Sequence, residues 1–285
     1  MSVAPLRWGT SSFSEKSWVG PFYPVGSKPR DFLSLYATHF DTVEVDATYY
    51  AVPDARVVSG WNVKVPEGFT LCAKFPRTIV HCGDRSTPDP AKVLVSDEAA
   101  ADTEAFLQSM RLLGGKCGPL VLQFPWFSRR APLPLATFLP RLEAYLAALP
   151  EDFRYGVEVR NREYLCDELL GLLRVHRTAL VLVEIANMPH PASLVDELDL
   201  FPTDFSYARL IGDRKAVDRA TDTFDRVVLD KSEDLTRWAK LLGTARERVP
   251  ETYVYANNHY AGHGPATIRE LRTRVEADAA SSFHP

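Results

Sequence analysis

Eight short apolar segments, separated by longer amphipathic ones, constrain the fold more than any other feature of this 285-residue sequence. Each segment has the length and the β-branched or aromatic content of a strand. Regular alternation of strands and helices predicts a parallel sheet, because parallel strands need crossover connections. Eight such units predict an α/β protein with a (β/α)8 TIM-type barrel. The expected strands cover residues 7–13, 42–50, 69–75, 119–124, 155–160, 179–185, 205–211 and 252–257.

Most segments between these strands have the apolar spacing of amphipathic helices. The first expected helix begins at Pro29, which suits a first helical turn, and the second stops at Gly114 and Gly115. An open doubly wound sheet is the alternative fold, but the glycine-rich dinucleotide and P-loop patterns are absent. The expected helices cover residues 29–40, 97–113, 135–149, 167–176, 235–249 and 265–275, and the long connections 76–92 and 187–204 are expected to build or cover a site.

Chain length favours a single domain, since one barrel takes about 250 residues. We expect this domain to span residues 1–276 and the tail 277–285 to be frayed. The content of 46% hydrophobic and 25% charged residues is typical of soluble globular proteins. A formal net charge of -4 gives no electrostatic signal for wrapping duplex nucleic acid or for binding an anionic membrane.

The cysteines and the N-terminal segment bear on the compartment. Cys72, Cys82, Cys117 and Cys166 are scattered without a paired spacing, which predicts free thiols in a reducing environment. The N-terminal residues lack the pattern of a signal peptide, and no run of 18 apolar residues occurs. A cytoplasmic protein is expected.

Charged residues recur at spacings of two within the expected strands. In TVEVDATYY, Glu44, Asp46 and Thr48 share one face, and in YGVEVRN, Glu158 and Arg160 do the same. Parallel barrel strands are covered on both faces, so an ionised side chain there is costly unless it is paired or used. We therefore expect these charges to point into the barrel.

Other polar residues lie late in their strands, where barrel active sites are built. They include Lys74, Gln123, Glu184, Arg209 and Asn257. Opposite charges at such a site would pair and shift each other's pKa values. A purely structural network of ion pairs is the alternative interpretation of the same residues.

Three cations point to an anion site. Lys74, Arg160 and Arg209 lie on alternate expected strands, which contribute side chains to a common layer of a barrel. Arginine binds phosphate and carboxylate groups through paired hydrogen bonds. Glu44 and Glu158 also resemble the carboxylate pair of a glycosidase, but neighbouring cations would lower the pKa of the proton donor.

Histidines and aromatic residues allow further interpretations. His81, in the connection after the third expected strand, is a candidate general acid or base, or a plain loop residue. His259 and His263 stand four apart, but the glycines and the proline around them do not secure a helix, so no metal site is predicted. A stacking wall is an alternative to core packing for the aromatic residues Trp8, Trp18, Tyr23, Tyr49 and Tyr50.

Three segments, WGTSSFSEKSWVGPFYP, FLSLYATHFDTVEVDATYYAVP and YVYANNHYAGHGPATIREL, resemble the YecE-like family, also called domain-of-unknown-function family 72. AKFPRTIVH, PLVLQFPW, VEVRN and YARLIGDR lie between them in the family's order. The resemblance covers nearly the whole chain and implies a TIM-barrel fold, without an established activity. By matching motif it implies a site at Thr10, Ser11, Glu44, Lys74, His81, Gln123, Glu158, Arg160, Arg209, Asn257 and Asn258.

The chain departs from the family pattern at three places. Asp46 stands where many members have asparagine, and residues 263–266 differ from the usual run after the paired asparagines. Ile211 stands where many members have histidine after the arginine–leucine pair of the seventh strand. If that histidine carries protons in relatives, Ile211 cannot replace it.

These features favour an enzyme that acts on a small anionic molecule, phosphorylated or sugar-like, by acid/base or hydrolytic chemistry of the hydrolase, lyase or isomerase type. A non-catalytic small-molecule sensor or interaction scaffold is one alternative, and a metal-dependent nuclease, by fold analogy only, is another. A small-molecule ligand is the expected partner, and no cofactor is predicted, with a divalent metal as the alternative. We expect Glu44, Lys74, Glu158 and His81 in catalysis, and Thr10, Ser11, Asp46, Gln123, Arg160, Arg209, Asn257 and Asn258 in substrate binding.

Overall fold

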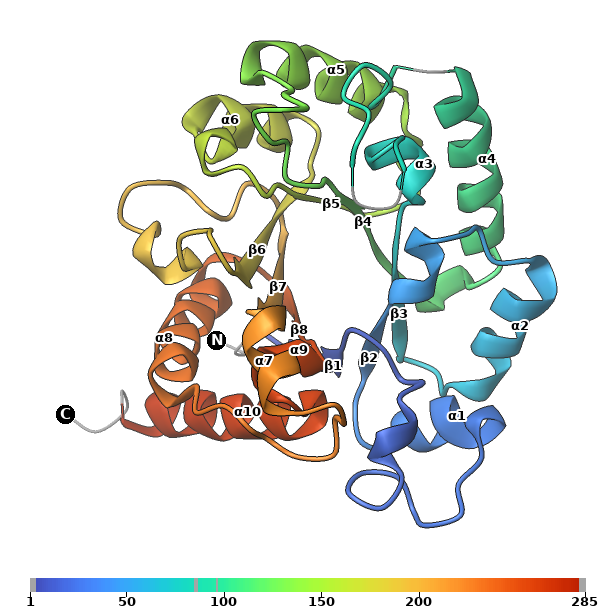
Figure 1. The fold of residues 1–285 in the computed structure, drawn as a ribbon, viewed down its shortest axis with the longest axis vertical. Helices are drawn as coiled ribbons and strands as arrows, with labels where there is room; N and C mark the ends of the chain where they lie inside the picture. The colour runs from blue at the N-terminus through green and yellow to red at the C-terminus, as the bar shows by residue number, and fades with distance from the viewer. Residues whose placement is uncertain (1–3, 85–86, 96, 282–285) are drawn as a thin grey trace. The chain divides into compact units, whose positions relative to one another are not determined.

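The computed structural model describes residues 4–84, 87–95 and 97–281 and confirms the (β/α)8 TIM-type α/β fold (Figure 1). Its eight-stranded sheet has the order β1-β8-β7-β6-β5-β4-β3-β2, so strands that follow each other in the sequence are neighbours. This order is what successive strand–helix units produce. The strands are β1 (Leu6–Thr10), β2 (Thr42–Val45), β3 (Thr70–Lys74), β4 (Cys117–Gln123), β5 (Tyr155–Glu158), β6 (Ala179–Ile185), β7 (Phe205–Gly212) and β8 (Glu251–Ala256).

Helices lie between the strands, and several begin at a side-chain cap. Asp54 accepts a hydrogen bond from the N–H of Val57 and caps the helix that follows it. Asp213 caps the helix after it in the same way, by accepting from the N–H groups of Lys215 and Ala216. The α-helices are α1 (Phe32–Tyr36), α2 (Ala55–Lys64), α3 (Arg77–Val80), α4 (Asp97–Arg111), α5 (Leu135–Ala148), α6 (Asp167–Val175), α7 (Arg214–Ala220), α8 (Ser232–Arg248), α9 (Asn258–Ala261) and α10 (Gly264–Ser281). Short 3-10 helices cover Lys16–Trp18, Pro29–Asp31, Asp46–Tyr49, Gly114–Lys116, Arg162–Tyr164 and Pro191–Ser193.

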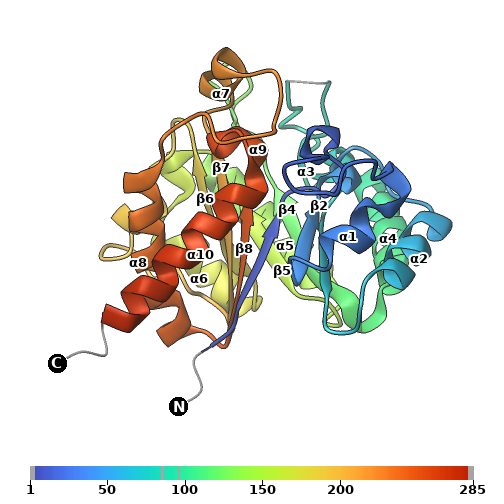
Figure 2. The same cartoon turned by 90° about the horizontal axis from the view of Figure 1, so that it is seen from below.

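The chain divides into two compact units. The first unit comprises Met1–Glu44 and Leu182–Pro285, and the second comprises Val45–Val181. In the first unit β8 pairs in parallel with both β1 and β7, and α8 and α10 lie side by side (Figure 2). Leu235, Trp238 and Leu242 form the buried face of α8 at helical spacing.

Gly9 shows how closely the first unit is packed. A Cβ atom at this position in β1 would lie 2.2 Å from the carbonyl oxygen of Thr42. Only glycine therefore lets the two backbones approach this far. The glycine of the WGTSSF segment is thus explained by packing.

In the second unit β4 pairs with β3 on one side and β5 on the other. The register places Lys74 opposite Val121 and Gln123 opposite Glu158. The residues of β4 after Cys117 are buried, as expected for a parallel strand covered on both faces. Three strand ends of this unit therefore meet at one edge of the sheet.

The expected strand over residues 42–50 is wrong beyond Val45, because Asp46 begins a 3-10 helix. The Thr48 hydroxyl explains the turn. It accepts a hydrogen bond from the N–H of Lys74 at 2.9 Å and lies 2.8 Å and 3.0 Å from the carbonyl oxygens of Lys74 and Val45. Asp46 and Thr48 consequently do not continue the strand face of Glu44.

Other expected boundaries also need correction. The strand expected over 155–160 ends at Glu158, so Arg160 lies in the following connection. The tail expected to be frayed over 277–285 is helical as far as Ser281, because EADAAS consists mainly of good helix formers, and 282–285 lie outside the described residues. The helix expected over 29–40 is a 3-10 turn followed by α1, and α2, α3, α7 and α9 were not predicted.

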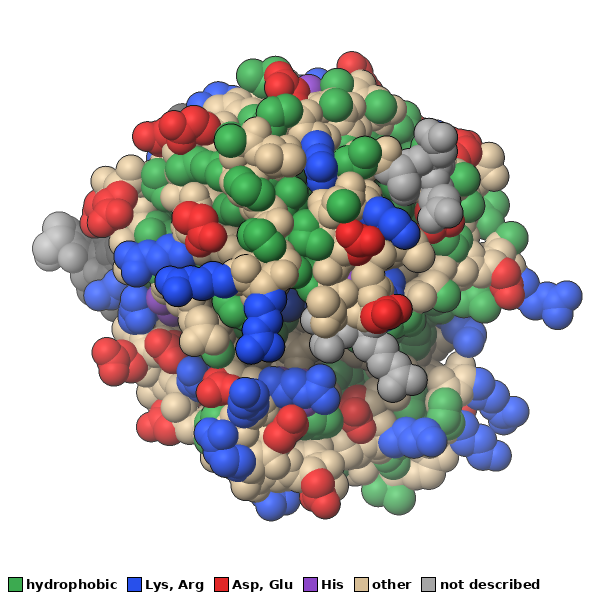
Figure 3. Space-filling model, turned by 45° about the horizontal axis from the view of Figure 1, so that its top comes forward, with side chains coloured by type: hydrophobic (Ala, Val, Ile, Leu, Met, Phe, Trp, Pro, Cys, Tyr) green, Lys and Arg blue, Asp and Glu red, His purple; other side chains and the backbone are tan. Residues whose placement is uncertain are grey.

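Three findings concern the surface, the helices and the cysteines. On the face shown in Figure 3, basic and acidic side chains are interspersed rather than sorted by sign. No helix in the described ranges is both long enough and apolar enough to cross a membrane. All four cysteines are free, as predicted.

Candidate functional site

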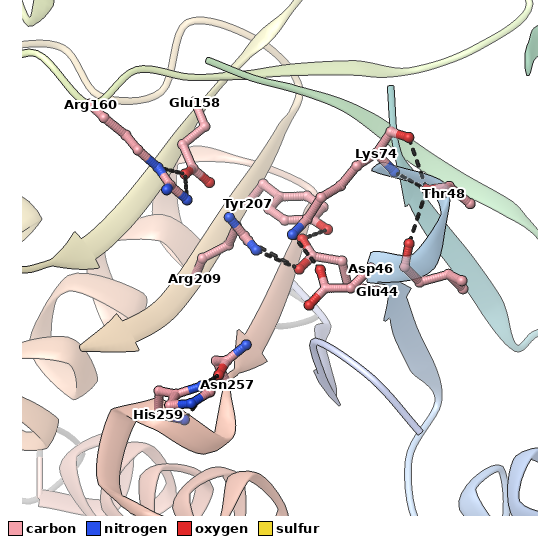
Figure 4. A network of polar contacts seen from close by, with 11 residues as sticks. Glu44, Asp46, Thr48, Lys74, Glu158, Arg160, Tyr207, Arg209, Asn257 and His259 are labelled. Atoms are coloured by element: carbon pink, nitrogen blue, oxygen red, sulfur yellow. Dashed lines mark hydrogen bonds and ion pairs between the residues drawn. The ribbon is translucent and has the colours of Figure 1, made fainter. Parts of the chain in front are cut away.

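Glu44 is the centre of a buried ion pair in the first unit (Figure 4). Its Oε1 accepts hydrogen bonds from Nε and Nη2 of Arg209 at 3.1 Å and 2.8 Å, and its Oε2 accepts from the Tyr207 hydroxyl at 2.7 Å. All three side chains are almost completely buried. A carboxylate bonded to a cation and a hydroxyl is stabilised in its ionised form. This arrangement suits charge compensation better than proton transfer.

Thr10 and Ser11 follow each other at the end of β1 and are both buried. The N–H of Thr10 donates to the Tyr36 hydroxyl oxygen at 2.7 Å, and this hydroxyl in turn donates to the carbonyl oxygen of Thr42 at 3.1 Å. The Ser11 Oγ has no hydrogen-bond partner among the residues that the structure describes. Thr10 is thus engaged in packing β1 against the chain before β2.

Asn257 and Asn258 accept hydrogen bonds at the N-termini of α9 and α10, the two helices that follow β8. The Asn257 Oδ1 accepts from the N–H of His259 at 2.9 Å and lies 3.0 Å from His259 Nδ1 (Figure 4). The Asn258 Oδ1 accepts from Trp18 Nε1 at 3.2 Å and from the N–H of Gly264 at 2.9 Å. Both asparagines therefore serve as caps, a role that the sequence pattern did not reveal.

His259 and His263 have different partners. His259 Nε2 lies 3.3 Å from Asp218 Oδ1, whereas His263 Nδ1 accepts from the N–H of Ala266 at 3.3 Å and its ring packs edge-on against Trp18. Burial, together with Arg269, lowers the pKa of His263 to about 4, so this ring is neutral at pH 7. Within the described ranges no three histidine, cysteine, aspartate or glutamate side chains are grouped to hold a metal ion.

Asp46 and Lys74 form an ion pair in the second unit (Figure 4). Lys74 is buried, and Thr48 fixes its backbone as described above. The Asp46 side chain is 33% exposed, so the pair meets solvent on its carboxylate side. Gln123 is buried next to Glu158 in the register of β4 and β5.

Glu158 and Arg160 form another ion pair of this unit. The Nε and Nη2 atoms of Arg160 both lie 2.8 Å from Oε1 of Glu158 (Figure 4). Glu158 is completely buried, whereas the Arg160 side chain is 25% exposed. Both contacts use one edge of the guanidinium, so the Nη1 edge has no partner in the described part of the chain. A planar donor edge is thereby held in place and left available.

Tyr49 lies within electrostatic reach of this pair and of Arg77, and Arg77 in turn lies within electrostatic reach of His81. Burial raises the pKa of the Tyr49 phenol, while the nearby cations of Arg160 and Arg77 act in the opposite direction. Arg77 Nη2 donates to the carbonyl oxygen of Gly83 at 2.6 Å. We call Tyr49, Arg77, His81, Glu158 and Arg160 the arginine site.

His81 is the titratable base of the arginine site. It is buried, and its Nδ1 accepts from the N–H of Gly83 at 3.3 Å, which assigns the ring proton to Nε2. Burial, and next the charge of Arg77, lowers the pKa of His81. The ring is therefore neutral at pH 7 and presents an N–H donor.

Sequence reasoning missed Arg77, although AKFPRTIVH places it three residues after Lys74, just beyond the end of β3. The sequence pattern grouped Glu184 with the other polar residues late in their strands, but this carboxylate belongs to a hydrogen-bond network separate from the arginine site. Glu184 accepts from Trp238 Nε1 at 2.6 Å and from the Tyr260 hydroxyl at 2.9 Å, on α8 and α9 of the first unit. Glu184 therefore joins β6 to these helices.

Comparisons with known proteins agree with this fold. The UPF0759 protein YecE of Escherichia coli K12 is 35% identical over 136 residues, which are 46% of this chain and 42% of YecE. The UPF0759 protein YunF of Bacillus subtilis 168 is 28% identical over 106 residues, which are 37% of this chain and 36% of YunF. The matched segments thus span less than half the length of either relative.

Solved structures match over most of the chain. The crystal structure of a DUF72 family protein, TM1631 of Thermotoga maritima MSB8, has a TM-score of 0.67 and 25% identity and covers 95% of this chain and 99% of its own. The crystal structure of EF0366, a DUF72 family protein of Enterococcus faecalis V583, has a TM-score of 0.69 and 20% identity, and the match covers 95% of this chain and 96% of EF0366. The family model described as protein of unknown function DUF72 matches residues 7–284. As the sequence motifs predicted, this chain belongs to the DUF72 family.

Proposed function

We propose that the arginine site binds a small anionic molecule and that the protein is an enzyme acting on this molecule by acid/base chemistry. The observation that carries the proposal is the pairing of Arg160 with a single oxygen of the buried Glu158. A guanidinium held in this way offers its remaining edge in the fork geometry that suits a phosphate or a carboxylate. Because the side chain is already fixed, little conformational entropy is lost on binding.

The surrounding charges favour an anion as well. Arg77 adds a second cation near Tyr49 and His81, while Glu158 is engaged with Arg160. An anion bound between two guanidinium groups would offset their mutual repulsion. Lys74 is balanced by Asp46 and contributes less net charge.

Within this proposal four of the five residues take distinct roles. Neutral His81 accepts a proton from the bound molecule as the general base, and the imidazolium that forms then returns the proton as the general acid. Arg160 and Arg77 bind the anionic group, and Glu158 positions Arg160 rather than transferring a proton. Glu44 belongs to the other unit and is engaged with Arg209 and Tyr207, so the proposal gives it no catalytic step.

Thermal unfolding in the presence of inorganic phosphate and a panel of phosphorylated and carboxylated metabolites tests the binding step. We expect ligands to raise the Tm of the wild type and not that of Arg160→Ala. Arg162→Ala is the matched control, because it removes an exposed arginine two residues away and should keep the wild-type response. An equal response of the Arg160→Ala variant would refute the proposal.

Turnover separates an enzyme from a sensor. A compound that stabilises the wild type is incubated with it, and the products are analysed by mass spectrometry. We expect conversion by the wild type and its loss in His81→Asn with binding retained. If every compound that stabilises the protein is recovered unchanged, the result would favour the non-catalytic sensor.

A further inference from the structure

We propose that the anion bound at the arginine site carries a ring, and that Tyr50 and Trp126 hold this ring beside Arg160. This inference rests on the proposed function and specifies its substrate class. The ring is either a planar aromatic system or a sugar, since both present a face that packs on an aromatic side chain.

Among the residues whose exposure is described, Tyr50 and Trp126 are the exposed aromatic side chains, at 73% and 63%. Both belong to the second unit, and both come shortly after the carboxyl end of a strand, β2 and β4. The strand between these two in the sheet is β3, which leads to Arg77. Tyrosine and tryptophan are enriched at binding interfaces, because each ring combines an apolar body with a polar group.

Tyr50 is linked to the arginine site through Tyr49. The two rings pack edge to face, with centroids 5.5 Å apart. The Tyr49 phenol lies within electrostatic reach of Arg160, Arg77 and Glu158. The Tyr50 ring is therefore one side chain away from the two guanidinium groups.

Trp126 is linked to the same site through Asn161. The Asn161 Oδ1 accepts from the N–H of Phe127 at 2.8 Å, and its Nδ2 donates to the carbonyl oxygen of Phe127 at 3.0 Å. Asn161 directly follows Arg160, and Phe127 directly follows Trp126. Since Asn161 is buried, this pairing fixes the backbone of Trp126 next to that of Arg160.

The two links connect each exposed aromatic residue to the arginine site, Tyr50 through Tyr49 and Trp126 through Phe127 and Asn161. The cation can bind the anionic group while Tyr50 and Trp126 contact the ring that bears it. A ligand with both parts is expected to bind at least about tenfold more tightly than the anion alone, because stacking on an aromatic side chain adds to the charge-assisted hydrogen bonds.

Isothermal titration calorimetry with four probes tests the inference: inorganic phosphate, glucose 6-phosphate, adenosine 5′-monophosphate and adenosine. Tyr50→Ala and Trp126→Ala are compared with the wild type and with Val63→Ala, a control that truncates an apolar side chain of the same unit that is 83% exposed. We expect a ring-bearing phosphate to bind at least tenfold more tightly than phosphate. Both aromatic variants should lose this advantage and keep their affinity for phosphate.

The outcomes separate the two proposals. Equal affinities of the wild type for phosphate and for both ring-bearing phosphates, or an advantage that survives in Trp126→Ala and Tyr50→Ala, would overturn the ring-binding inference alone. Phosphate binding that does not depend on Arg160 would overturn the proposed function, and no binding of any probe overturns both. A preference for the nucleotide over the sugar phosphate identifies a planar ring, and the reverse identifies a sugar.

Discussion

Arg160 places both its Nε and its Nη2 atoms 2.8 Å from the same oxygen of Glu158. Glu158 is completely buried, and the Arg160 cation compensates its charge. The relationship ties the stability of the second unit to the residue that we propose to bind the anion. It also makes the pair suitable for a double-mutant cycle.

We expect Arg160→Ala to lower the free energy of unfolding by about 3 kcal/mol, because it leaves a buried carboxylate without its cation. Urea denaturation at pH 7 measures the loss. The double variant Arg160→Ala with Glu158→Gln should be more stable than the sum of the single changes predicts. Additive effects would show that the pair contributes no coupling energy.

Tyr207→Phe should destabilise the protein by about 2 kcal/mol, because it removes the hydroxyl that donates to the buried Glu44. The same substitution at Tyr50, whose side chain is largely exposed, is the control and should leave stability unchanged. Chemical denaturation of the three proteins checks this. A Tyr207→Phe variant as stable as the control would mean that Glu44 finds another donor.

His263 predicts a pH dependence of stability. Its pKa is lowered to about 4 in the folded protein, against about 6.5 in an unfolded chain. The unfolded state therefore binds more protons between these values, so stability is fully present above about pH 6.5 and falls as the pH drops toward 4. The loss is of the order of 3 kcal/mol.

His263→Asn tests this pH dependence, because an asparagine oxygen can still accept from the N–H of Ala266. Denaturation midpoints are measured from pH 4 to pH 7.5 in both proteins. The variant should show a shallower decline than the wild type below pH 6.5. Parallel curves would assign the decline to other groups.

Glu184→Gln should lower the free energy of unfolding by about 2–3 kcal/mol. Burial alone would raise the pKa of Glu184, but hydrogen bonds from His190, Trp238 and Tyr260 lower it overall. A glutamine would turn its own N–H donors toward groups that also donate. Phosphate binding, measured by calorimetry, should be unchanged, since Glu184 lies in the first unit and the arginine site in the second.

Alternation of apolar and amphipathic segments was sufficient to predict the fold class, and the strand expected over 179–185 matches β6 in both boundaries. Such a strand is recognisable because a continuous aliphatic run is buried on both faces. The strand over 42–50 was overestimated, since its end depends on hydrogen bonds between Thr48 and Lys74, 26 residues apart. Periodicity within a segment carries no information about such partners.

The candidate site was predictable in part for the same reason. Charges at alternate positions identified Glu158 and Arg160 as a pair worth attention, and the structure joins them directly. The spacing of two did not distinguish a strand residue from a residue beyond the strand end, which is where Arg160 lies. Trp126 and Arg77 were not selected, because neither interrupts a periodic pattern. Whether Arg209 shares a ligand with Lys74 and Arg160 stays a prediction.

The pairing of Asn161 with both backbone groups of Phe127 has a consequence for how this site can diverge. The Asn161 side chain joins the connections after β4 and β5, because it forms with one residue the two backbone hydrogen bonds that a neighbouring strand would form. Position 126, adjacent to this joint, can exchange its side chain without changing the separation of the two backbones, whereas the side chain at position 160 also compensates the charge of Glu158. Under the proposed function, ligand preference can therefore be altered at position 126 while the frame that carries it stays the same.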